Sequence, residues 1–214
     1  MLATLPNRPE EKSTSPVPFF HLLERLKTTK REGWRRFGIT WGESISDHMY
    51  RMSIMTMIAP PSLSSRLNVP HCTKMALIHD MAESLVGDIT PVDVSVPKAE
   101  KARREAAVMQ YIAQDLLGGI AGGKLLGSDV LQIFQEYEDN ITLESKFVHD
   151  IDKLELLLQM VEYEREHGIR LEEFCHVENR IELPEIQEWA KTVVNEHKEV
   201  TAGKKRTLAQ DGKT

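Results

Sequence analysis

The chain has 214 residues, of which 41% are hydrophobic and 28% are charged, and its formal net charge is −6. This length and composition predict a single globular domain with a substantial core, and the acidic balance argues against nonspecific nucleic-acid binding. The sequence contains no run of 18 apolar residues, so it predicts no membrane-spanning helix. Cys72 and Cys175 lack CxxC spacing and are expected to be reduced thiols. The sequence shows no targeting signal, so we expect a cytoplasmic location. The Lys-Lys-Arg run at 204–206 leaves a nuclear location open.

Helical periodicity dominates the chain, and no segment alternates as a strand would, so we expect an all-α, single-domain helical bundle. Residues 1–18 contain four prolines and no apolar stretch typical of a signal peptide, and are expected to form a disordered leader. Residues 19–198 are expected to form the domain. Residues 199–214 are expected to be a flexible basic tail.

Prolines, glycines and capping residues predict where the helices begin and end. The expected helices, in chain order, are one after Pro18, one from a cap at Ser44 or Ser46 to about Ala59, one from Pro70 to near Gly87, one from Pro97 to Gly118-Gly119, one capped by Ser128 or Asp129, one from about Leu143 to His167, and one from Pro184.

The helix expected after Pro70 contains an adjacent His79-Asp80 pair in an apolar stretch, with Glu83 close behind. An imidazole and a carboxylate are costly to bury unless each has a partner, and one metal ion would satisfy both. Residues three and four apart share a helix face, so His79, Asp80 and Glu83 can converge on one point. His48 lies in a largely apolar row of the preceding long helix and is a further candidate ligand.

Two acids of the helix expected at 143–167 compete for the last ligand position. Asp150 shares its row with Lys146 and Lys153, so we expect a solvated surface acid there, with His149 also at the surface. Asp152 shares its row with apolar residues, where a lone carboxylate is unfavourable unless a cation meets it. Asp152 is therefore the expected ligand.

Together, the candidate ligands offer two imidazole nitrogens and at least two carboxylate oxygens. Such a mixed set accepts Mn, Co, Fe, Ni, Zn or Mg, and the sequence does not choose among these divalent cations. Each residue alone has a plainer interpretation, as a satisfied core histidine or a helix-face acid. Asp88, between Gly87 and Ile89, reads by itself as a turn residue.

The order His, His-Asp, Asp resembles that of the HD-domain metal-dependent phosphohydrolases. The stretches from Glu43 to Met52 and from Ala76 to Ile89 resemble more narrowly the HD domain-containing protein 2 group of 5′-deoxynucleotidases. The resemblance covers roughly residues 19–195. It implies a helical HD-domain bundle with the metal site between core helices. It also implies hydrolysis of deoxyribonucleoside 5′-monophosphates to the deoxyribonucleoside and phosphate.

The resemblance assigns roles to the candidate residues. It implies that a catalytic acidic residue, Glu83, acts beside the main metal, and that Glu83, Asp88 and the backbone of Ile89 serve a second, weaker cation. The main metal is then held by His48, His79, Asp80 and Asp152. Relatives often form homodimers, so a homodimer is expected, with no nucleic-acid or membrane partner.

Arg31 and Trp34 fall where the family has an arginine and a tryptophan near the nucleotide. Arg31 is suited to clamp the phosphate bidentately, and Trp34 to stack on base or sugar. The alternative for Trp34 is a buried anchor of the first loop. The glycine-rich segment between Gly118 and Val130 departs from the relatives and is expected to be a surface insertion.

Three other functions remain open at this point. An HD phosphohydrolase could act on a cyclic nucleotide, a nucleoside triphosphate or an alarmone. The second alternative is a non-enzymatic HD-fold binding module. A di-iron oxygenase is the third, and it needs further inward histidines, for which His71 and His149 are the nearby candidates.

Overall fold

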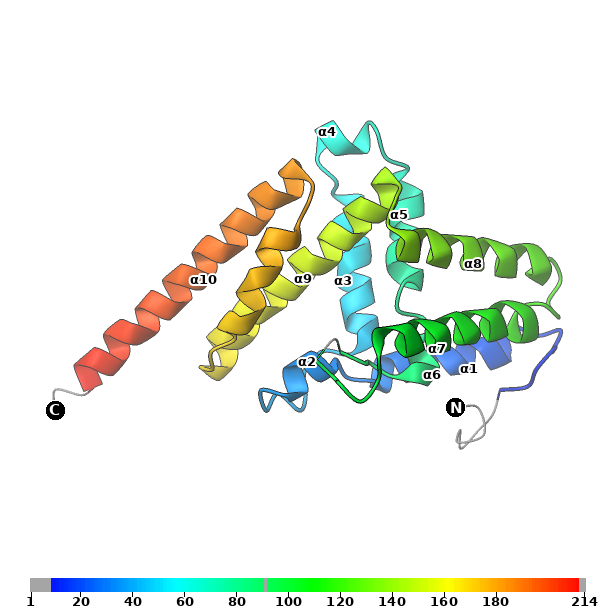
Figure 1. The fold of residues 1–214 in the computed structure, drawn as a ribbon, viewed down its shortest axis with the longest axis horizontal. Helices are drawn as coiled ribbons and strands as arrows, with labels where there is room; N and C mark the ends of the chain where they lie inside the picture. Colours follow the sequence, from blue (N-terminus) through cyan, green and yellow to red (C-terminus); the bar gives the residue numbers. More distant parts are fainter. Residues whose placement is uncertain (1–8, 91, 212–214) are drawn as a thin grey trace.

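The computed structural model describes residues 9–90 and 92–211, with side chains described as far as residue 202. Within this part the chain is helical, and its sole β-type pairing is an isolated bridge between Lys30 and Ser44. The expected all-α class is confirmed, and Figure 1 shows the helices crossing one another in a bundle. No described helix is long and apolar enough to cross a membrane.

Long helices are joined by short helical turns in this bundle. In chain order the elements are α1 (Val17–Thr28), α2 (Glu32–Arg35), α3 (Ile45–Met57), α4 (Pro61–Ser64), α5 (Val69–Ile78), α6 (Glu83–Val86), α7 (Lys98–Tyr111), the π-helical turn η2 (Ile112–Leu116), α8 (Gly123–Asp139), α9 (Leu143–His167), the 3₁₀ segment η3 (Glu172–Arg180) and α10 (Pro184–Asp211).

Local capping explains the helix ends that the sequence predicts correctly. Ser44 caps α3 by accepting a hydrogen bond from the Asp47 backbone N–H, while the Asp47 carboxylate accepts one from the Ser44 N–H. Helix α9 begins after a Thr142 cap and ends at Gly168, whose φ of +71° favours glycine. Both ends of α9 are therefore confirmed.

The single helix expected from Pro70 to Gly87 is wrong, because the structure has two helices there with a tight turn between them. Helix α5 ends at Ile78, and α6 begins at Glu83. In between, the backbone N–H groups of Met81 and Glu83 donate to carbonyls three residues back, at 2.9 and 3.0 Å. This tighter winding occurs without a proline or glycine to mark it, and the apolar residues continue through it at helical spacing. The sequence therefore does not reveal the break.

The expected start of the next helix at Ser128 or Asp129 is also wrong, since α8 already begins at Gly123. Gly123 and Gly127 are buried, but most residues of 118–130 are at least partly exposed, so the expected surface insertion remains a prediction. A Cβ at position 127 would lie 2.5 Å from the Ala113 carbonyl oxygen, so glycine lets α8 pack closely on η2.

The flexible basic tail expected after residue 198 remains a prediction. Helix α10 continues through residues 199–211, where no proline interrupts it, and residues 212–214 lie outside the described part. At the other end, residues 1–8 of the expected leader also lie outside it. The domain limits at 19 and 198 remain a prediction.

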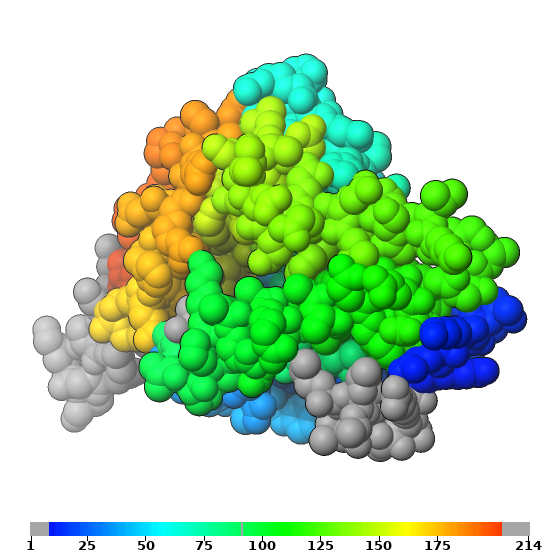
Figure 2. Space-filling view, turned by 45° about the vertical axis from the view of Figure 1, so that its right-hand side comes forward, coloured from blue at the N-terminus to red at the C-terminus, as the bar shows by residue number. Residues whose placement is uncertain are grey.

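Helix α9 lies at the centre of the arrangement that positions the site. It packs against α3, α5, α8, η3 and α10 (Figure 1). Most of its buried side chains are apolar, including Phe147, Ile151, Leu154 and Leu157. Figure 2 shows the segment before α7 meeting η3 on one face of the molecule. Because α9 packs against both α3 and α5, polar groups of α9, α3 and the turn after α5 face one another inside the bundle.

Candidate metal centre

The two predicted histidines meet inside the bundle, with ring centroids 5.6 Å apart. His48 comes from α3 and His79 from the end of α5, and both are buried. The Nδ1 atom of His48 lies 2.6 Å from Glu155 Oε2, and that of His79 lies 3.0 Å from the Ala76 carbonyl oxygen. The two Nε2 atoms are buried without a hydrogen-bond partner among the described residues. Such nitrogens, with the opposite ring atoms already held, are suited to bind a metal ion.

Asp152 completes a group in which one donor atom each of His48, His79 and Asp152 lies within 4.8 Å of the others, and Asp80 lies beside this group. Asp152 Oδ1 lies 3.2 Å from His48 Nε2, and Asp80 Oδ2 lies 3.2 Å from His79 Nε2 and 3.9 Å from His48 Nε2. Burial opposes ionisation of both aspartates, but the nearby histidines and Arg31 hold the pKa of each carboxyl below its usual range. We call His48, His79, Asp80 and Asp152 the four-ligand cluster.

The charge balance of the four-ligand cluster favours a cation at its centre. Burial and the neighbouring Arg31 oppose a charge on His48, but Glu155 and Asp152 outweigh them and raise the pKa of its imidazole to about 10. The carboxylates thus attract positive charge to a buried position. A divalent ion bound by Nε2 would supply that charge in place of the proton, so the donor set fits a metal.

A second group of possible ligands, Glu43, His48 and Glu155, also lies close enough to hold an ion. The guanidinium of Arg51 already meets Glu155, with Nη2 2.6 Å from Oε1. Burial and the Glu155 carboxylate raise the pKa of Glu43 to about 7, and its Oε1 already accepts a hydrogen bond from Trp34 Nε1–H. We therefore place the ion on the Nε2 side of His48.

Glu83 begins α6 at the edge of the four-ligand cluster. Its side chain is buried, and its Oε2 has no hydrogen-bond partner among the described residues. Its Oε1 lies 3.6 Å from the Lys101 ammonium. Burial, with the charges of Asp80 and Asp88, raises the pKa of Glu83 well above its usual value. A buried carboxyl with a raised pKa can exchange a proton with a neighbouring water.

Asp88 and Ile89 lie outside the four-ligand cluster. Asp88 Oδ2 accepts a hydrogen bond of 2.5 Å from the Glu32 backbone N–H, so this carboxylate fastens the start of α2. Both residues line the neighbouring cavity. The second, weaker cation at Glu83, Asp88 and Ile89 remains a prediction.

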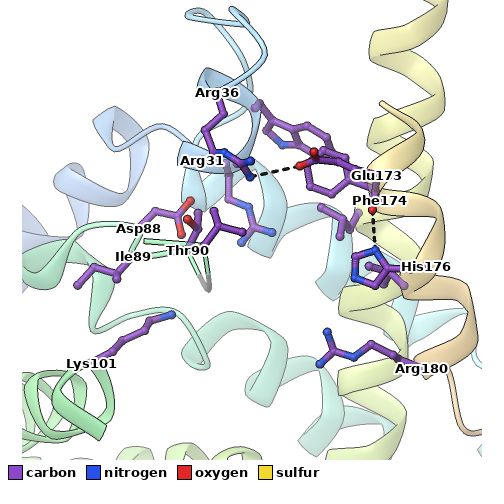
Figure 3. A pocket seen from close by; sticks show the side chains of 15 residues that line it. Arg31, Arg36, Asp88, Ile89, Thr90, Lys101, Glu173, Phe174, His176 and Arg180 are labelled. Atoms are coloured by element: carbon purple, nitrogen blue, oxygen red, sulfur yellow. Dashed lines mark hydrogen bonds and ion pairs between the residues drawn. The ribbon is translucent and has the colours of Figure 1, made fainter. Parts of the chain in front are cut away.

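The neighbouring cavity has a volume of about 290 Å³, and Arg31 joins it to the four-ligand cluster. Arg31 Nη1 lies 3.4 Å from Asp80 Oδ2. Burial disfavours its charge, but Asp80 and Asp88 hold the pKa of the guanidinium above its usual range. Figure 3 shows Arg31 reaching into the space between the Asp88–Thr90 segment and η3. Arg31 is therefore placed to meet an anionic group beside the metal site.

Trp34 touches the same cavity, but its side chain is 1% exposed. Its Nε1–H donates to Glu43 Oε1 at 2.8 Å, and its ring packs against Tyr163 and Phe174. This geometry favours the buried anchor over a ring that stacks on the nucleotide. Phe174, which is half-buried, covers the side of Trp34 nearest η3.

The opposite wall of the cavity comes from η3, which sequence reasoning missed. Phe174, His176, Val177 and Arg180 line it, facing Lys101 and Ile89 across the space in Figure 3. No proline, glycine or regular period marks residues 172–180 as a structured wall, so the sequence carries no local signal for it.

Glu155 and Arg51 were also missed, although a signal exists for Glu155. It is an acid inside the run Leu154 to Leu158 and lies three residues after Asp152, on the same helix face. Such a carboxylate in a core-facing row needs a partner by the same argument that selected Asp152.

The expectation that His149 and Asp150 lie at the surface is wrong. Asp150 is fully buried and accepts hydrogen bonds from the backbone N–H groups of Glu182 and Leu183. His149 is half-buried, stacks on Tyr137 at 3.9 Å, and contacts the Tyr137 carbonyl oxygen through Nε2 at 2.9 Å. Neither residue joins the four-ligand cluster. His71 pairs with Glu136 at 2.7 Å, so these histidines do not support a di-iron site.

Comparison with known proteins agrees with this geometry. A family model described as HD domain matches residues 23–189. The 5′-deoxynucleotidase hdd1 of Schizosaccharomyces pombe is 45% identical over 194 residues, which cover 89% of this chain and 94% of that protein. The 5′-deoxynucleotidase HDDC2 of Xenopus laevis is 36% identical over 196 residues, covering 90% and 92%.

Solved structures show the same fold. The HD domain-containing protein YGK1, of Saccharomyces cerevisiae, matches with a TM-score of 0.65 and 28% identity over 86% of each chain. A conserved hypothetical protein from Pyrococcus furiosus matches with a TM-score of 0.69 and 25% identity over 86% of this chain and 99% of that one.

Proposed function

This chain belongs to the HD domain family, and we propose that it is a metal-dependent 5′-deoxynucleotidase. The reaction would hydrolyse a deoxyribonucleoside 5′-monophosphate to the deoxyribonucleoside and phosphate. One observation carries the proposal: two buried, unpartnered Nε2 atoms converge with two carboxylates beside a cavity that Arg31 enters. Relatives that match along most of the chain and are named 5′-deoxynucleotidases support the substrate class.

The four-ligand cluster would hold the catalytic cation. When bound, a divalent ion neutralises phosphate charge and lowers the pKa of a coordinated water towards about 7. Four protein ligands leave positions for water and a phosphate oxygen on an ion that accepts six. We propose Mn, Co, Mg, Zn, Fe or Ni as the ion, because mixed nitrogen and oxygen ligands suit each of them.

Arg31 would bind the phosphate next to the metal. Its guanidinium can donate two parallel hydrogen bonds to phosphate oxygens, and its contact with Asp80 keeps it beside the four-ligand cluster. Lys101 and Arg180 place further positive charge on opposite walls of the cavity (Figure 3). A phosphomonoester dianion would therefore be attracted to this end of the cavity.

Glu83 would handle the proton of the reaction. Its carboxyl is buried at the start of α6, four residues after His79, and its raised pKa suits a group that exchanges a proton with water. It can take a proton from the attacking water or hold that water in line.

The nucleoside would occupy the rest of the cavity. Leu156, Phe174 and Val177 supply apolar surface there, and Leu156 lies one turn of α9 after Asp152. A sugar hydroxyl buried against apolar side chains loses its hydrogen bonds to water, so such a surface favours a deoxyribose over a ribose.

The deciding experiment measures phosphate release from deoxyribonucleoside and ribonucleoside monophosphates side by side, after loading with Mn, Co or Mg. Nucleoside triphosphates, cyclic nucleotides and an alarmone belong in the same panel. The expected result is fastest turnover of the deoxyribonucleoside monophosphates. Faster turnover of another class of nucleotide would assign that class as the substrate. If no compound in the panel is hydrolysed, the chain is a non-enzymatic binding module. Asp80→Ala protein, purified identically, controls for contaminating phosphatase.

A homodimer and a cytoplasmic location remain parts of the proposal. Light scattering across a concentration series tests the first. Fractionation of cells that express the chain tests the second, with nuclear enrichment as the opposing outcome.

A further inference from the structure

Glu155 lies on the side of His48 that faces away from the four-ligand cluster. Its side chain is fully buried in α9, and its Oε2 lies 2.6 Å from His48 Nδ1. Its other oxygen, Oε1, accepts a hydrogen bond of 2.8 Å from Arg51 Nε and lies 2.6 Å from Arg51 Nη2. Neither the proposed chemistry nor substrate binding uses this carboxylate.

The Arg51 guanidinium is itself held in place by the next turns of α9. Its Nη2 donates to Gln159 Oε1 at 2.7 Å, and its Nη1 donates to Glu162 Oε2 at 2.7 Å. Along α9, the polar positions 152, 155, 159 and 162 are spaced by three and four residues and therefore share one face. His48 and Arg51, three residues apart on α3, meet that face.

We propose that Glu155 is a positioning residue that aims His48 at the metal. Its Oε2 accepts the Nδ1–H of His48, which selects the tautomer whose Nε2 lone pair faces the four-ligand cluster. Arg51 holds the carboxylate so that it cannot turn away. The inference rests on the metal site of the proposed function, but not on its substrate.

The physical argument is one of tautomer and orientation. A neutral imidazole carries its proton on one nitrogen, and a fixed acceptor at Nδ1 leaves Nε2 as the donor to the metal. A buried carboxylate is costly without cationic partners, and Arg51 compensates for burying Glu155. The contact between Glu155 and His48 therefore serves the metal site, and Arg51 offsets the free-energy cost of burying the carboxylate.

Metal affinity tests this role directly, because it is measured without substrate. The Kd for Co²⁺ is determined by competition with a chelator for the wild-type chain, Glu155→Ala and Glu155→Gln. We expect Glu155→Ala to bind Co²⁺ about 10–100-fold more weakly, the usual range for losing a partner that orients a ligand. Glu155→Gln retains an acceptor for Nδ1–H but loses the charge that holds Arg51, so we expect a smaller loss of at least threefold.

Glu162→Gln is the matched control. It alters another carboxylate partner of Arg51, on the same helix face, but Glu162 is about half exposed and does not touch His48. Its Kd should stay within twofold of wild type. Equal losses in Glu162→Gln and Glu155→Ala would assign the effect to helix packing and overturn the proposal.

A spectroscopic measurement separates positioning from general stability. In the Co²⁺ protein, the His48 Nδ1–H should give a slowly exchanging, paramagnetically shifted proton resonance that persists in Glu162→Gln and disappears in Glu155→Ala. If Glu155→Ala does not fold, the Kd of Glu155→Gln for Co²⁺ is compared with that of the wild-type chain instead. Wild-type affinity in a folded Glu155 variant, or no metal binding by the wild-type chain, overturns the inference. Metal binding without nucleotide hydrolysis would overturn only the proposed function.

Discussion

The carboxylate of Asp150 accepts the backbone N–H of Leu183 at 2.7 Å, and so fastens the start of α10 to α9. It also accepts the Glu182 N–H at 3.0 Å and lies 3.1 Å from the Lys153 ammonium. Two residues further on, Asp152 faces the opposite way, towards His48. Neighbouring acids on one helix therefore serve different purposes, one structural and one in the four-ligand cluster.

This difference predicts opposite effects for two matched substitutions. Asp150→Asn should lower the free energy of unfolding by about 1–3 kcal/mol, because buried N–H groups lose a charged acceptor. Its metal content should stay near wild type. Asp152→Asn should abolish metal binding while the metal-free protein unfolds at nearly the wild-type denaturant concentration. Urea titrations and metal analysis of both proteins measure this, and comparable metal loss in the two would contradict the assignment.

Asp80→Ala should remove both metal and phosphate release while the helical fold persists. Asp80 Oδ2 approaches both imidazoles of the four-ligand cluster, so the substitution removes a carboxylate that we propose as a metal ligand. Helical content from circular dichroism and metal stoichiometry check the two halves of the prediction. A stoichiometric ion with near-normal turnover would remove Asp80 from the four-ligand cluster.

Glu83→Gln should separate catalysis from metal binding. The amide keeps the size of the side chain but cannot exchange the proton, so turnover should fall by roughly 10²–10⁴. The ion should remain, because the four-ligand cluster is untouched. Single-turnover kinetics and metal analysis provide the measurement. Complete metal loss would make Glu83 a ligand, and an unchanged rate would move the proton transfer elsewhere, with Asp88 the next candidate.

Arg31→Lys should weaken substrate binding more than it weakens metal binding. A lysine keeps the positive charge but loses the two parallel donors, so we expect KM for a deoxyribonucleoside monophosphate to rise about tenfold. Arg36→Lys is the control, since Arg36 lines the same cavity but pairs with Glu173 at 3.2 Å on its rim. Its KM should stay within about twofold. Equal changes in both would place the phosphate elsewhere.

Removal of the ion should lower the melting temperature. A ligand that binds the folded state at 100 times its Kd stabilises that state by about 2.7 kcal/mol, and a chelator withdraws this contribution. The test is thermal unfolding with and without chelator, followed by addition of excess Mn²⁺ or Co²⁺ to restore the transition. Asp152→Asn protein should show no shift under the same treatment.

Much of the fold and site follows from local pattern. The capping box at Ser44 and the glycine at 168 are encoded within a few residues, so the limits of α3 and α9 are predicted well. The apolar helix rows around His48 and Asp152 predict both as ligands, because polar groups in such rows require a partner. The pattern around Asp150 wrongly predicts a surface position, because its hydrogen-bond partners lie 32 and 33 residues further along the chain.

The sequence by itself determined the all-α class and singled out His48, His79, Asp80 and Asp152 as candidate ligands, since helical periods and polar groups in apolar rows are local properties. Only the tertiary structure decided the turn that separates α5 from α6, the wall that η3 adds to the cavity, and the contact of Glu155 with His48. These features depend on how α9 packs against α3 and η3. Contacts between residues a hundred positions apart leave no period in the sequence, so only the folded chain reveals them.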